Sequence, residues 1–133
     1  MSKAEKNHRK KLKHRTTEGK SKGHTKSSLV MAQHHHMAGR LPQAKVIYNE
    51  ILQAEPNNPD ALHLLGVINH QAGNLESAVD LISKALKAEP NFPEALNNLG
   101  NVYIDLDRFQ EAVDSYNLSL GIKPDYLMAQ NNL

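Results

Sequence analysis

Histidine is the side chain best suited to chemistry in this sequence, because its imidazole titrates near neutral pH and binds metals. The chain contains eight, and His36, His63 and His70 fall in segments with helical periodicity. His63 and His70 are seven residues apart, about 10 Å along a helix, whereas zinc ligands on one helix prefer a spacing of four. No carboxylate or thiol completes a site, so we interpret these histidines as polar residues on a binding surface. A metal pair between His36 and His70 is the alternative.

Asparagine offers a second kind of chemistry. Asn97, Asn98 and Asn101 crowd one short segment, and Asn131 and Asn132 repeat the first two of them further along the chain. An amide side chain both donates and accepts hydrogen bonds, so it can pair with a peptide backbone whatever the side chains of the ligand. Asparagine is also unfavourable inside helices. This pattern favours a polypeptide-binding face, and a plain solvated helix surface is the alternative.

Common catalytic signatures are missing from the sequence. It contains no phosphate loop, dinucleotide fingerprint, nucleophile elbow or HExxH motif, and its carboxylates are scattered singly. With no cysteine, thiolate zinc sites, disulfide scaffolds and cysteine nucleophiles are excluded. The sequon Asn117-Leu118-Ser119 falls inside a predicted helix, and we attribute it to chance. We therefore predict that this chain is not an enzyme and uses no cofactor.

The elements that position these residues recur with a period of about 34 residues. The motif Ala54-Glu55-Pro56-Asn57 returns as Ala88-Glu89-Pro90-Asn91. Three further columns are formed by Ala44, Ala78 and Ala112, by Leu52, Leu86 and Leu120, and by Pro56, Pro90 and Pro124. So many columns at one period predict a repeat protein.

Each repeat is predicted to hold two helices. Leu62, Leu65, Gly66 and Asn69 show the i, i+3, i+4, i+7 spacing of a first helix, and the second helix follows a breaker. Proline ends each second helix and opens the next first helix. Gly66 and its counterpart Gly100 are expected to let a partner helix approach closely. The breakers are Gly39, Gly73 and Asp107.

This pattern resembles the tetratricopeptide repeat family over residues 25–126, with copies at 25–58, 59–92 and 93–126 and a partial fourth at 127–133. The resemblance implies an all-α, right-handed α-solenoid of antiparallel helix pairs spanning residues 27–133. In this family the first helix of each pair lines a concave groove that binds extended peptides or partner helices. Mapped onto this chain, that groove is expected to include His36, His63, Val67, His70, Asn97, Asn98, Asn101, Ile104, Asn131 and Asn132.

Two branches of the family bear on the ligand. Asn98 and Asn132, one period apart, resemble successive rungs of the asparagine ladder with which O-linked N-acetylglucosamine transferases hold substrate polypeptides. The amino-acid sequence of the repeats also resembles bacterial arrays that precede a glycosyltransferase or sulfotransferase domain. The branch that grips terminal carboxylates of chaperone tails is not matched, because Glu94 would repel an anionic ligand.

Charge divides the chain into two parts. Residues 1–26 carry ten Lys or Arg against two Glu, a net charge of +8, whereas residues 27–133 carry six against twelve, a net charge of −6. With almost nothing to bury, the first part is predicted to be a disordered basic arm. A solvated arm is favoured over a weak contact with nucleic acid or an anionic surface.

The function predicted from the sequence is a non-catalytic protein–protein interaction module that binds a protein or peptide in its groove. The alternative is the substrate-docking region of a larger glycosyltransferase or sulfotransferase, since the unfinished fourth repeat suggests a fragment of a longer chain. No apolar run is long enough to span a membrane. The missing export signal and the lack of cysteine favour a cytoplasmic location.

Overall fold

The computed structural model describes residues 23–133, so the predictions made for residues 1–22, including the basic block of the arm, lie outside the described residues. A helix occupies residues 23–37 and therefore includes residues 23–26, which the sequence analysis placed in the arm. The helices that follow it are α2 (Leu41–Ala54), α3 (Pro59–Gln71), α4 (Leu75–Ala88), α5 (Pro93–Asp105), α6 (Phe109–Ile122) and α7 (Leu127–Asn132).

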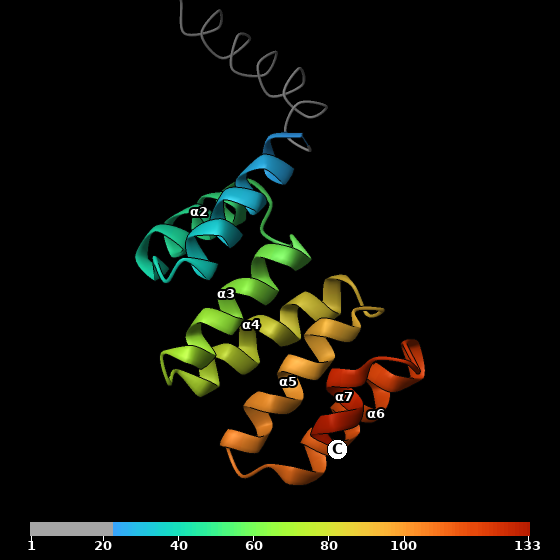
Figure 1. Ribbon diagram of the computed structural model, residues 1–133. Helices are drawn as coiled ribbons and strands as arrows, with labels where there is room; N and C mark the ends of the chain where they lie inside the picture. Colours follow the sequence, from blue (N-terminus) through green and yellow to red (C-terminus); the bar gives the residue numbers. More distant parts are fainter. Residues whose placement is uncertain (1–22) are drawn as a thin grey trace, which may run out of the picture.

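These helices form a stack of antiparallel pairs (Figure 1). We call residues 23–37, α3, α5 and α7 the first helices, and α2, α4 and α6 the second helices. The largest contacts join α3 to α4 and α5 to α6, and each second helix also packs against the first helix that follows it. Residues 23–133 contain no strand. The predicted all-α solenoid is confirmed, with α7 as the start of a fourth pair.

Helix ends lie where local chemistry places them. Pro59 and Pro93 open α3 and α5, where the missing N–H costs nothing. The Asn58 side chain caps α3 by accepting the N–H of Ala61 at 2.9 Å. The predicted breakers all adopt positive φ, at +80° for Gly39, +82° for Gly73 and +58° for Asp107. Aspartate tolerates this left-handed conformation better than most residues, so it can end α5 without a glycine.

The helices of a pair approach closely at small residues. Ala78 and Ala112 are fully buried. A Cβ added at Gly66 would lie 2.6 Å from Cγ1 of Ile82 and 3.4 Å from the backbone oxygen of Ala78. A Cβ at Gly100 would overlap the ring of Tyr116. The predicted close approach is confirmed, and the side chains that occupy the missing Cβ positions are Ile82 and Tyr116 rather than the alanines alone.

We therefore expect Gly66→Ala to destabilise the array by about 1–3 kcal/mol, because the buried Ile82 has no room to move away. Gly121→Ala is the matched control, since a Cβ there meets nothing within 4 Å, and the better helix propensity of alanine should leave stability equal or up to about 1 kcal/mol higher. Urea unfolding followed by circular dichroism measures both. Equal stability of the two variants would contradict this packing.

Candidate functional site

Successive first helices are joined by polar contacts between residues 35 positions apart. His36 Nε2 donates to Gln71 Oε1 at 2.8 Å. Asn98 Nδ2 and His63 Nε2 are 2.7 Å apart. His70 Nε2 donates to Asp105 Oδ2 at 2.5 Å, and Asn132 Nδ2 donates to Asn97 Oδ1 at 2.9 Å. Residues that bond across neighbouring first helices are therefore separated by one residue more than the period of the sequence.

His63 is enclosed by the repeat that follows it. Its side chain is only 6% exposed, and its ring meets the edge of Phe92 with centroids 4.8 Å apart. Burial lowers the pKa of His63 to about 4, against the opposing negative charge of Glu94. The imidazole is therefore neutral at pH 7 and accepts the amide N–H of Asn98. This histidine joins two repeats and offers little surface to a ligand.

Asn97 has the same place in the next repeat and is fully buried. Its Oδ1 accepts from Asn132, and its Nδ2 has no partner among the described residues. The expected rungs Asn98 and Asn132 make equivalent contacts with the preceding first helix, because Asn98 bonds back to His63 and Asn132 bonds back to Asn97. Part of the asparagine pattern therefore holds one repeat against the next.

An open pocket lies where the ends of α3 and α5 meet α7 and the second helix α6. Its volume is about 490 Å³. Five of the ten residues predicted to line a groove border it, together with two that the sequence analysis missed, Asp105 and Tyr116. The seven lining residues are His70, Asn101, Ile104, Asp105, Tyr116, Asn131 and Asn132.

The other predicted groove residues lie outside this pocket. His36 is bonded to Gln71 at the junction of the first two repeats, and Val67 and Asn98 are half-buried on the first helices. His36 and His70 hydrogen bond to different partners, Gln71 and Asp105. Within residues 23–133, no cluster of three His, Cys, Asp or Glu side chains could hold a metal ion.

Asp105 and Tyr116 could have been found only in part from the sequence. Asp105 stands one period after Gln71, but nothing in that column indicates that it contacts a histidine of the preceding repeat. Tyr116 follows the core column of Ile82, and its ring is indeed buried. Its hydroxyl nevertheless reaches Asn101 Oδ1 at 2.5 Å. Helix periodicity assigns a side chain one face, whereas this tyrosine spans the core and the pocket.

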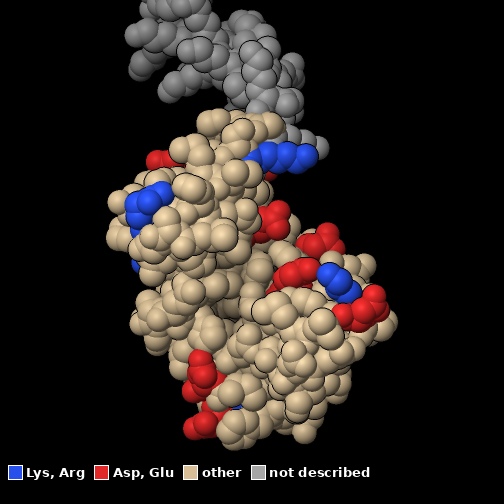
Figure 2. Space-filling view, in the orientation of Figure 1, with Lys and Arg blue, Asp and Glu red and all other residues tan. Residues whose placement is uncertain are grey.

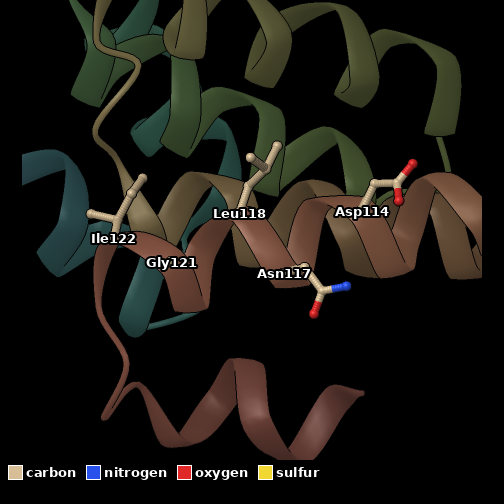
Figure 3. A pocket seen from close by; sticks show the side chains of 5 residues that line it. All are labelled: Asp114, Asn117, Leu118, Gly121 and Ile122. Atoms are coloured by element: carbon tan, nitrogen blue, oxygen red, sulfur yellow. The ribbon is translucent and has the colours of Figure 1, made fainter.

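A second hollow, of about 520 Å³, lies along the exposed side of α6 (Figure 3). Leu118 and Ile122 project from the same side of that helix, and Asn117 projects from another. Ser119 is fully buried and donates to the backbone oxygen of Pro93 at 2.9 Å. The sequon at residues 117–119 thus lies inside α6, as predicted.

The fold and the row of first helices are those of a helical repeat protein. Tetratricopeptide repeat models match residues 35–97 and residues 93–126. The chain belongs to the tetratricopeptide repeat family. No curated protein matches it.

Solved structures show the same architecture. A mutant O-GlcNAc transferase from Thermobaculum terrenum is 28% identical with a TM-score of 0.82, over 85% of this chain and 22% of that one. MamA is 21% identical with a TM-score of 0.73, over 93% of this chain and 69% of MamA. The first TPR of Spaghetti (RPAP3), bound to the HSP90 peptide SRMEEVD, is 18% identical with a TM-score of 0.77, over 82% of this chain and 86% of that one. This chain therefore spans about a fifth of the transferase.

The enclosure of His63 predicts a pH dependence of stability. Its pKa is lowered from 6.5 to about 4 on folding, so the unfolded chain binds more protons between these values. This contribution to stability is complete above about pH 6.5 and is lost as the pH falls to about 4, by on the order of 3 kcal/mol.

In His63→Gln, thermal unfolding should change less between neutral pH and about pH 4 than in the wild type. His34→Gln, at an exposed histidine, is the control and should keep the wild-type pH dependence. An unchanged slope in His63→Gln would show that the imidazole is not buried in its neutral form.

Proposed function

We propose that this chain is a non-catalytic interaction module that binds an extended peptide along its first helices, with the pocket at Asn101 and Asn132 as its central subsite. Family membership supports a protein-binding role. The observation that carries the proposal is the pocket itself, which gathers the amide side chains of Asn101, Asn131 and Asn132 beside Ile104. Amide groups both donate and accept hydrogen bonds, so they can fix a peptide by its backbone.

Charge constrains the ligand. The peptide in the Spaghetti structure, SRMEEVD, is acidic. In this chain Asp60, Glu94 and Asp105 lie on the first helices, and Lys123 Nζ lies 3.8 Å from Glu94 Oε1. An anionic peptide would meet these carboxylates. We therefore propose a neutral or basic extended ligand, in line with the sequence-based exclusion of chaperone tails.

The division into an arm at residues 1–26 and an array at residues 27–133 belongs to the same proposal. Contact of the arm with nucleic acid or an anionic surface has no support in the described residues. None of the helices described for residues 23–133 is both long enough and apolar enough to cross a bilayer. The cytoplasmic location stays a prediction.

The second candidate function is the substrate-docking region of a larger glycosyltransferase-like enzyme. It is favoured by the likeness to the Thermobaculum terrenum transferase, of which this chain covers 22%. The two candidates share the peptide-binding groove and differ in what is joined to it. The open reading frame around the coding sequence tests the difference: a glycosyltransferase or sulfotransferase domain in frame supports the enzyme, and repeats alone contradict it.

Replacement of both pocket amides, in Asn101→Ala with Asn132→Ala, should abolish the selection of short peptides from a random display library, because the donor and acceptor groups of the pocket are lost. Asn117→Ala is the matched control, since Asn117 is an exposed amide on α6. It should select the same peptides as the wild type. Circular dichroism checks that the double variant remains helical. Equal enrichment by the double variant and the wild type would contradict the groove assignment.

A further inference from the structure

The amide of Asn101 is held in one orientation. Its Oδ1 accepts the hydroxyl of Tyr116 at 2.5 Å and Nδ2 of Asn132 at 3.2 Å. A carbonyl oxygen has two lone pairs, so both are used within the protein. The Nδ2 group of Asn101 is left over as a hydrogen-bond donor in a residue that lines the pocket.

The amide of Asn132 is held the other way round, with its Nδ2 group bonded within the protein and its Oδ1 left over. Its Nδ2 donates to Asn97 Oδ1 at 2.9 Å and to Asn101 Oδ1 at 3.2 Å, which uses both of its N–H groups. Its Oδ1 has no partner among residues 23–133 and is left as an acceptor. The pocket therefore presents one fixed donor and one fixed acceptor. The N–H and C=O of one extended residue complement such a pair, because both point to the same side of a strand.

A carboxylate stands beside this pair. Asp105 accepts from His70 Nε2 at 2.5 Å through Oδ2, and its side chain remains 53% exposed. Arg108, close by in sequence, is engaged elsewhere: it donates to both oxygens of Glu111, at 2.7 and 2.6 Å, and lies 4.7 Å from the ring centroid of Tyr103. The negative charge of Asp105 therefore faces the pocket without a Lys or Arg partner among the described residues.

The previous repeat provides a natural comparison. Gln71 stands at the position equivalent to Asp105 and accepts from His36 in the same way. The hydrogen bond between first helices is thus kept, while the charge is present only at the third repeat. A neutral glutamine would suffice to hold the helices together, so the carboxylate adds something that stacking does not require. Figure 2 shows the charged groups of one face in small separate patches, with most of the surface uncharged.

We propose that this pocket binds a Lys or Arg residue in an extended segment of a partner polypeptide. The backbone of that residue bonds to Asn101 Nδ2 and Asn132 Oδ1, and its cationic side chain pairs with Asp105. The proposal rests on the proposed function and adds the class of side chain that the groove selects. Exposed ion pairs are weak, so the backbone bonds supply most of the affinity and Asp105 supplies the preference.

The test uses the full chain and a display library of short random peptides. The wild type should enrich peptides with Lys or Arg at one position. A synthetic enriched peptide should bind about two- to fivefold more weakly when that residue is replaced by norleucine. In Asp105→Asn the same replacement should make no difference, because the asparagine still accepts from His70 but carries no charge. Asp80→Asn, an exposed carboxylate on the second helix α4, is the control and should keep the wild-type difference.

The outcomes distinguish a failure of the charge preference from a failure of the proposed function. Peptides enriched without a basic residue, yet dependent on Asn101 and Asn132, would overturn the charge preference and leave the proposed function standing. A preference for Lys or Arg that persists in Asp105→Asn would also overturn it. If the library yields no binder, both proposals fail. Unchanged thermal unfolding of Asp105→Asn shows that any loss of preference is not a loss of structure.

Discussion

The distance between the two helices of each pair is the constraint on which this structure depends. It is set by small residues: Gly66 lies against Ile82, Gly100 lies against Tyr116, and Ala78 is fully buried nearby. Where no Cβ stands, the facing side chain fills the space and dispersion contacts replace water. The spacing within a pair fixes where the next first helix can pack, and therefore where the side chains of neighbouring first helices meet.

The contacts between neighbouring first helices are polar and differ from one junction to the next. The second and third repeats are joined by His63 with Asn98, and the third repeat and α7 by Asn97 with Asn132. A buried polar group costs free energy unless its hydrogen bond is made. An apolar repeat stacked in the wrong place would leave His63 or Asn97 without a partner. These pairs therefore favour one order of repeats, which uniform leucine interfaces would not do.

The period of the sequence made the fold predictable, because it reports which positions are equivalent, and equivalent positions have the same burial. The glycines, the prolines at Pro59 and Pro93 and the breaker at Asp107 were all found in this way. The site was predictable only in part, since contacts between repeats are offset by one residue from that period and no column of equivalent residues reveals the offset. Asn98 and Asn132 are equivalent in the sequence, and only the structure shows that each bonds to the repeat before it.

The hydrogen bonds of Asn132 have a consequence for thermodynamic linkage. Asn132 lies in the six-residue α7, and its amide both completes the pocket and fastens this short helix to α5 through Asn97 and Asn101. In a linear array, each unit is stabilised by its neighbours. A ligand that needs Asn132 in place binds only molecules in which α7 is docked, so it stabilises the docked position of this helix. Ligand binding in the pocket and docking of α7 against α5 are thus coupled, and each makes the other more favourable by the same amount of free energy.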